Sequence, residues 1–183
     1  MTRYRLQHWR NRAQIFASAL PEETADWLFD PASLTARLIR TCPGEFAVKV
    51  LQQSYSLPRL SEHRILHMQN RERAIIREVH LLCDGHPVVY ARTVIPVSTL
   101  TGAQKRLTFL GNKSLGAILF SDRTMERGEV QIARLKAEQV KLDSATNEDI
   151  WGRRSVFTLS AKPLLVSEYF LPELFSNTWR SPK

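Results

Sequence analysis

The sequence contains no long run of apolar residues. No stretch approaches the roughly twenty apolar residues that a helix needs to cross a bilayer, so we expect no membrane insertion. The first residues, MTRYRLQHWRNRAQ, are basic and hold no apolar segment of the kind found in signal peptides. Hydrophobic residues make up 43% of the 183 residues, as in an ordinary globular protein. We therefore expect residues 1–183 to form a single domain with its own core.

Cysteine is scarce. Cys42 and Cys83 stand in no CxxC or other metal-type spacing. We therefore expect no disulfide framework and interpret Cys83 as a thiol of the core. Free thiols fit a reducing compartment, so the cytoplasm is the expected location. His63 and His67 (HRILH) lie four residues apart, but no third ligand is evident and the Glu of HExxH is missing, so we expect no metal and no cofactor.

Acidic residues are outnumbered, with 18 Asp and Glu against 26 Lys and Arg, which gives a formal net charge of +8. The basic residues are scattered, and no RNP-type aromatic motif, zinc-finger spacing or basic region with heptads accompanies them. Scattered positive charge solvates a surface and speeds the capture of small anions. We therefore expect no nucleic-acid partner. A basic RNA-binding protein is an alternative that steeply salt-dependent RNA binding would support.

Local signals predict hairpins interleaved with short helices, which indicates an α+β fold with an antiparallel sheet. Pro21 with the following acids starts a helix, and Ser33 and Ser114 suit the N-caps of two more. The polar stretch 136–149 is interpreted as a surface loop. The expected helices are 21–29, 33–40, 101–110 and 114–120, and the expected strands are 45–55, 73–83, 86–96, 123–133, 151–160 and 163–171.

Two hairpins place charges on faces that are otherwise apolar. Asp84-Gly85 is a strong two-residue turn. Side chains alternate along a strand, so Arg77 shares its face with apolar neighbours and should point inward. The opposite face should be solvated; it carries Glu78, His80 and Asp84. Counting from the turn pairs Cys83 with His86, Leu81 with Val88, Val79 with Tyr90 and Arg77 with Arg92.

Two arginines that face each other inside a protein repel, so something anionic should lie between them. In the second hairpin, a turn at Ala161-Lys162 places Glu168 on an apolar face opposite Ser155. One interpretation is an internal ion pair of Glu168 with Arg77 or Arg92. The other is a pocket for an anion that carries a hydroxyl group, because arginine clamps a carboxylate in a bidentate fashion. Arg154 is expected to lie solvated on the outer face.

Three segments, REVHLLCDGHPVVYARTVIPVSTLTG, NKSLGAILF and IWGRRSVFTLSAKPLLVSEYFLP, resemble the chorismate lyase family over about residues 75–172. The resemblance implies a single α+β domain in which short helical flaps cover a buried ligand pocket. It also implies a carbon–oxygen lyase that removes pyruvate from chorismate and leaves 4-hydroxybenzoate, the first committed step towards ubiquinone. The family needs no metal, and we expect a monomer.

The resemblance also implies roles for individual residues. Arg77 matches the carboxylate-binding arginine, and Glu168 matches the glutamate near the ring hydroxyl; these two are the candidate catalytic residues. The matched backbone amide belongs to Leu115. Leu34 stands at a ligand-lining position that is methionine in some members. Arg92, the arginine of the RTV motif, is expected to bind the second carboxylate or the leaving enolpyruvate.

A rival interpretation is a non-catalytic, effector-binding domain. Effector domains of some transcription regulators share the chorismate lyase fold. They follow a DNA-binding winged helix, and residues 1–70 are too irregular to form one. Ligand binding without turnover would favour this alternative.

Overall fold

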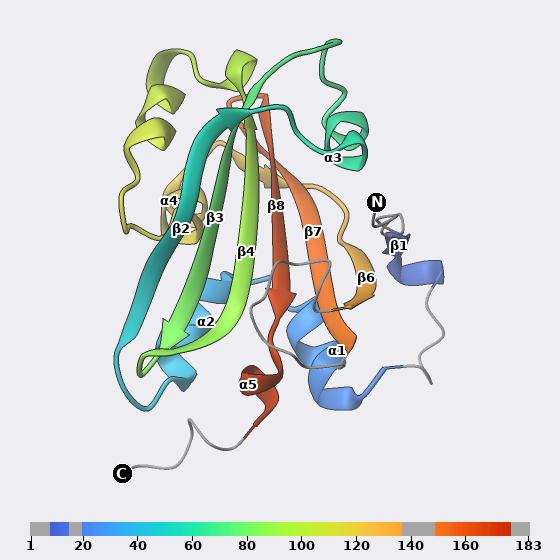
Figure 1. The fold of residues 1–183 in the computed structure, drawn as a ribbon, viewed down its shortest axis with the longest axis vertical. Helices are drawn as coiled ribbons and strands as arrows, with labels where there is room; N and C mark the ends of the chain where they lie inside the picture. The colour runs from blue at the N-terminus through green and yellow to red at the C-terminus, as the bar shows by residue number, and fades with distance from the viewer. Residues whose placement is uncertain (1–7, 15–19, 137–148, 177–183) are drawn as a thin grey trace, which may run out of the picture.

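A computed structural model describes residues 8–14, 20–136 and 149–176. In these residues eight strands form one antiparallel sheet in the order β1-β6-β7-β8-β4-β3-β2, and β5 pairs with β7 (Figure 1). No helix among them is long and apolar enough to span a membrane. The predicted α+β class with an antiparallel sheet is confirmed. The strands are β1 (Arg10–Asn11), β2 (Phe46–Ser56), β3 (Ala74–Cys83), β4 (His86–Pro96), β5 (Met125–Arg127), β6 (Gln131–Lys136), β7 (Asp149–Leu159) and β8 (Lys162–Phe170).

Short helices connect and cover the strands. They are α1 (Glu22–Phe29), α2 (Leu34–Thr41), α3 (Leu60–Ile65), α4 (Leu115–Ser121) and α5 (Pro172–Phe175), with 3-10 turns η1 (Arg12–Gln14), η3 (Val97–Thr99) and η4 (Gly102–Phe109). The predicted caps are confirmed, because the Ser33 and Ser114 hydroxyls accept from the amides of Ala36 and Ala117. The predicted loop lies largely in residues 137–148, outside the described residues. Its two ends, Lys136 and Asp149, are paired strand residues.

The first hairpin turns at Asp84-Gly85 as predicted, and Cys83 lies opposite His86. A β-bulge follows, because Leu82 pairs with Pro87 while Leu81 pairs with Val89. The extra residue on β4 shifts every later pair by one position. Arg77 therefore lies opposite Thr93, and the predicted Arg77–Arg92 pairing is wrong. A one-residue shift moves side chains to the other face of the sheet, so Arg92 lies away from Arg77.

The second hairpin turns one residue earlier than predicted. Leu159 pairs with Lys162, and Ser160 and Ala161 form the turn with φ of 49° and 62°. Both residues adopt the left-handed conformation that a two-residue hairpin turn requires, although neither is glycine. The residue opposite Glu168 is consequently Arg153, not Ser155.

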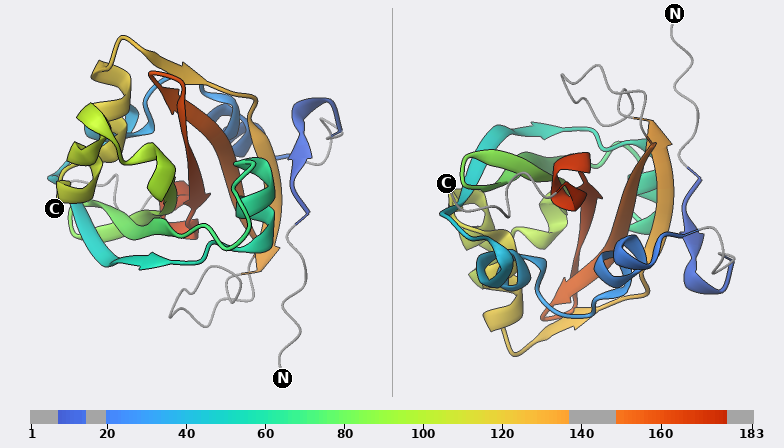
Figure 2. Two further views of the ribbon diagram at one scale, coloured as in Figure 1. Left: turned by 90° about the horizontal axis from the view of Figure 1, so that it is seen from above. Right: turned by 90° about the horizontal axis from the view of Figure 1, so that it is seen from below.

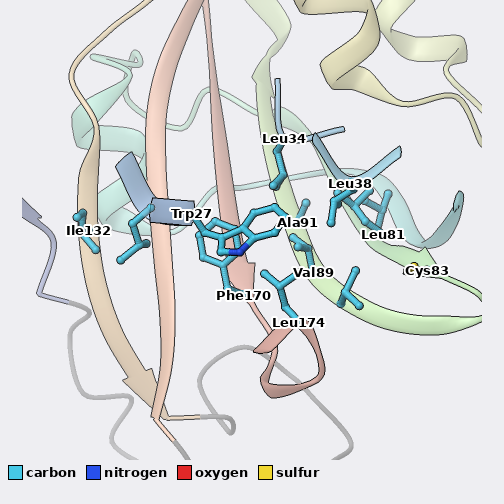
Figure 3. Packing of buried hydrophobic residues seen from close by; sticks show 13 residues of the cluster. Trp27, Leu34, Leu38, Leu81, Cys83, Val89, Ala91, Ile132, Phe170 and Leu174 are labelled. Carbon is cyan, nitrogen blue, oxygen red and sulfur yellow. The ribbon is translucent and has the colours of Figure 1, made fainter. Parts of the chain in front are cut away.

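The sheet is strongly curved and carries helices on both sides (Figure 2). Helices α1, α2 and α4 lie against one face, and α3 lies against the other. A core cluster joins Trp27, Leu34 and Leu38 of α1 and α2 to Leu81, Val89 and Ala91 of the sheet, with Phe170 and Leu174 beside them (Figure 3). Leu107, Leu115 and Leu119 form a second cluster on the same side with Ile75 and Phe157. The helices are therefore fixed to the sheet by apolar packing.

A disulfide joins Cys42 to Cys83, and the expectation of free thiols is wrong. Cys42 is the C-cap of α2, and Cys83 is the last residue of β3. The turn after Cys42 leads into β2, whose first residue, Phe46, pairs with Cys83. The two Cα atoms lie 5.7 Å apart, within the range that a disulfide spans. Sequence spacing alone could not reveal this proximity, because 41 positions separate the two cysteines.

Candidate active site

One cavity lies between the sheet and helices α2 and α4. Arg77, Leu115, Glu168 and Leu34, four of the residues expected at the site, all line it. They come from β3, α4, β8 and α2, and only the tertiary fold brings them together. The rest of the lining is mostly apolar and includes Val48, Val79, Leu81, Ala91, Leu119, Phe157 and Val166. A mostly apolar cavity with a few convergent polar groups is typical of a small-molecule site.

Arg77 supplies the cation of this cavity. It is 3% exposed, and its Nη1 donates to Gln53 Oε1 at 3.0 Å. Its Nη2 donates to the carbonyl oxygens of Gly111 at 2.8 Å and Lys113 at 3.3 Å. Burial lowers the pKa of Arg77, but a guanidinium stays protonated. Among the described residues no carboxylate forms an ion pair with Arg77, so the charge of this buried cation is not neutralised and attracts an anionic ligand.

Leu115 is the first residue of α4, where amide groups have no partner within the helix. Helices α2 and α4 form the side of the cavity opposite the sheet, here called the roof. The two helices are joined beside Leu115, because Thr35 Oγ1 and Ser114 Oγ lie 2.7 Å apart. Gly116 permits this close approach of α2 and α4, since a Cβ there would lie 2.8 Å from Thr35 Oγ1. Leu34, at the start of α2, is 4% exposed and contributes apolar surface to the same roof.

Glu168 is the acid of the cavity. Its Oε2 accepts from Arg153 Nε at 2.6 Å. The predicted internal ion pair therefore exists, but its cation is neither Arg77 nor Arg92. Sequence reasoning missed Arg153, because an early turn in the second hairpin was needed to place it opposite Glu168. The signal was present in the strand alternation, since Arg153 and Phe157 share a face of β7 and Phe157 lines the cavity.

Arg92 lies on the other face of the sheet, where its side chain is enclosed by acids. Its Nε and Nη2 donate to the two carboxylate oxygens of Glu62 at 2.7 and 3.0 Å, and its Nη1 donates to Glu78 at 2.5 Å. Burial opposes the charged form, but these two acids raise the pKa of Arg92. Arg92 is not among the residues that line the cavity. Its expected contact with a ligand is therefore corrected to a structural ion-pair cluster.

Much of the outer face is buried, contrary to expectation, although His80 is only partly buried and Asp84 at the hairpin turn is exposed as expected. Glu78 is 4% exposed and Arg154 is 7% exposed. Arg154 donates Nε to Gln131 Oε1 at 2.8 Å and lies over the ring of Trp9, 4.4 Å from its centroid. Burial lowers the pKa of Arg154 to about 10. Helix α3, which contributes Glu62, covers part of this face; its sequence gave no clear helix signal, and it was not predicted.

Solved structures show the class of fold. The C-terminal domain of the histidine utilization repressor from Pseudomonas syringae pv. tomato matches with a TM-score of 0.56 and 12% identity, over 76% of this chain and all of that chain. A GntR-family transcriptional regulator from Bacillus cereus matches with a TM-score of 0.53 and 13% identity, over 73% of this chain and 96% of that chain. At these identities the likeness extends to the fold alone.

Sequence comparison is more specific. The family model for chorismate lyase matches residues 6–179. A protein of Azoarcus sp. named "Probable chorismate pyruvate-lyase" is 42% identical over 171 residues, covering 85% of this chain and 90% of that protein. One of the same name from Methylococcus capsulatus is 38% identical over 154 residues, covering 82% of this chain and 95% of that protein. The chain belongs to the chorismate lyase family.

Proposed function

We propose that the chain is a chorismate pyruvate-lyase, which cleaves chorismate into 4-hydroxybenzoate and pyruvate. The observation that carries the proposal is the convergence of Arg77, Leu115 and Glu168 on one cavity in a chain of this family. Chorismate carries a ring carboxylate, a hydroxyl at C4 and an enolpyruvyl ether at C3. A buried cation and a carboxylate on different walls of an apolar cavity complement the first two groups.

The reaction gains its driving force from aromatisation. The C4 hydrogen leaves as a proton, its electron pair forms a ring double bond, and the C3–O bond breaks to release enolpyruvate, which becomes pyruvate on protonation. The protein has to hold one reactive conformer and exclude water. The enclosed, apolar lining formed by α2, α4 and the sheet suits both tasks.

Arg77 clamps the ring carboxylate of the substrate together with the amide of Leu115. Gln53 and the carbonyls of Gly111 and Lys113 already fix the guanidinium, so its orientation is set before the substrate binds. Glu168 accepts a hydrogen bond from the C4 hydroxyl and orients it. Leu34 covers the ring as part of the roof. Arg92 has no part in this scheme, because it is enclosed by Glu62 and Glu78.

The proposal is tested by incubating the purified protein with chorismate and measuring 4-hydroxybenzoate and pyruvate. We expect equal amounts of the two products, and we expect Arg77→Ala to lower kcat/KM by about 30- to 150-fold, the worth of a charge-assisted hydrogen-bonded contact of roughly 2–3 kcal/mol. Arg134→Met is the matched control, because it removes an exposed arginine that pairs with Asp149 on the sheet. Normal turnover by Arg77→Ala would exclude Arg77 from the site. Binding of 4-hydroxybenzoate without any turnover of chorismate would favour an effector-binding domain instead.

The enzyme is proposed to act as a monomer, because Arg77, Leu115 and Glu168, the groups that the scheme uses, converge within a single chain. The elution volume of the purified protein in size-exclusion chromatography measures this. The cytoplasmic location expected from the sequence stays a prediction, and the free thiols on which it rested are joined in the Cys42–Cys83 disulfide.

A further inference from the structure

Arg153 is the most deeply buried charged side chain beside the cavity. It lies on β7 directly opposite Glu168 on β8, and its side chain is 2% exposed. Its Nε donates to Glu168 Oε2 at 2.6 Å. This bond occupies one carboxylate oxygen of Glu168. The other oxygen, Oε1, has no hydrogen-bond partner among the described residues. Because Glu168 lines the cavity, Oε1 is available to a ligand there.

The Nη1 group of the same guanidinium is bound by backbone carbonyl oxygens. Arg153 Nη1 donates to the carbonyl oxygens of Trp27, Leu28 and Asp30 at 3.0, 3.4 and 2.8 Å. These residues form the end of α1, where the last carbonyls of a helix lack partners of their own. Because a guanidinium is rigid and planar, the helix end fixes where the Nε group points.

A second cation strengthens the field at Glu168. Arg127 donates Nε to Ser155 and Nη1 to the carbonyls of Asp30 and Pro31. Burial lowers the pKa of Arg127 and the nearby Arg153 lowers it further, whereas Glu168 and Asp30 favour its charged form. Glu168 therefore faces Arg153 across the ladder, and the charge of Arg127 on β5 also acts on Glu168. Asp30, which interacts with Arg127 and Arg153, forms an ion pair with Arg37.

We propose that Arg153 is a positioning residue of the lyase reaction. It holds the Glu168 side chain through Oε2, so that Oε1 is presented to the C4 hydroxyl of the substrate. It also ties that carboxylate to the end of α1, from which the chain continues into α2 and the roof of the cavity. This inference rests on the proposed function, because it assigns Arg153 to the same site. Arg153 acts through Glu168 and does not touch the substrate.

A double-mutant cycle separates this role from a merely structural one. Arg153→Met, Glu168→Gln and the double variant are assayed for kcat and KM with chorismate, and thermal unfolding of each is recorded. If Arg153 acts through Glu168, Arg153→Met lowers kcat by at least about tenfold in the wild-type background and by less than about twofold in the Glu168→Gln background. We expect Arg153→Lys, which keeps the charge but loses the planar fork, to recover part of kcat. Arg134→Met is again the matched control and should leave kcat unchanged.

Two further measurements keep the test decisive. If Arg153→Met does not fold, the cycle is run with Arg153→Lys, whose effect should likewise vanish in the Glu168→Gln background. If the Glu168→Gln variants turn over too slowly, the Kd of 4-hydroxybenzoate, whose ring hydroxyl Glu168 contacts, replaces kcat in the cycle. Equal losses in both backgrounds, or an unchanged kcat in Arg153→Met, would overturn the proposal. Failure of the proposed function itself looks different, because the wild-type protein would then release no pyruvate.

Discussion

Arg77 and Arg92 show how one residue type takes two roles on adjacent strands. Arg77 points into the cavity and has no carboxylate partner among the described residues. Arg92 points to the other face and is hydrogen-bonded to Glu62 and Glu78, with all three side chains at most 7% exposed. A buried guanidinium between two carboxylates is satisfied and has little left to offer a ligand. The difference follows from one bulge residue in β4.

Replacing Arg92 by methionine should therefore damage stability and not substrate binding. Two buried carboxylates would lose their cation, which costs about 3–5 kcal/mol of the free energy of unfolding. Urea unfolding followed by fluorescence measures this loss, and KM for chorismate measured on the folded fraction should stay near the wild-type value. Arg92→Lys keeps a charge and should lose less. A fully stable Arg92→Met protein with a greatly raised KM would return Arg92 to the site.

The α1–α2 segment shows how a short element is held over a cavity. These helices have eight residues each, too few to be stable alone. Arg37 of α2 forms ion pairs with Asp26 and Asp30 and lies over the ring of Trp27, 3.7 Å from its centroid. Burial raises the pKa of Asp30, but the Ala32 amide and Arg37 outweigh it and hold that pKa below its ordinary value of 3.8. The charged form of Asp30 therefore stabilises the folded segment.

Asp30→Asn should lower the free energy of unfolding by roughly 1–2 kcal/mol at pH 7, because Arg37 loses a part-buried charged acceptor. The sign of the pH dependence follows from the lowered pKa. The difference between wild type and variant is fully present above about pH 4, the ordinary value for aspartate, and closes as the pH falls through the lower pKa of the folded state. Unfolding curves between pH 2.5 and pH 7 measure it, with Asp26→Asn as a more exposed control expected to change little. If the difference in unfolding free energy between wild type and Asp30→Asn grew at low pH, it would contradict a lowered pKa of Asp30 in the folded state.

At the scale of the whole molecule, the Cys42–Cys83 bond closes the chain segment that contains β2, α3 and β3. It ties the end of the roof helix α2 to the hairpin end of the sheet. A crosslink across 41 positions restricts the unfolded chain, which stabilises the folded state by about 2–4 kcal/mol.

Reduction of this bond should therefore lower the free energy of unfolding by about that amount. Urea unfolding with and without reductant measures the change, and thiol titration of the untreated, denatured protein should find no free thiol. The Cys42→Ser/Cys83→Ser variant should resemble the reduced protein and should not respond to reductant. Two reactive thiols in the untreated protein would contradict the bond.

Local chemistry in the sequence determined much of this protein. The serine caps, the Asp84-Gly85 turn and the alternation of β3 sufficed to predict α2, α4, the first hairpin and the inward direction of Arg77. Alternation in the second hairpin also placed Glu168 on an apolar face, and the resemblance to a family added Leu115 and Leu34. The fold places all three on one cavity. Each of these features depends on residues a few positions apart or on a motif that is contiguous in the sequence.

Only the tertiary structure decided what depends on a single-residue shift or on distant contacts. The β4 bulge and the early turn at Ser160-Ala161 each change which side chains face each other, and the pattern of apolar residues does not reveal either one. They removed Arg92 from the cavity and placed Arg153 against Glu168. The Cys42–Cys83 bond and the burial of the outer face by α3 also join segments far apart in sequence. These interactions stabilise the protein only because the fold brings distant segments close together in space, and this proximity cannot be inferred from local sequence.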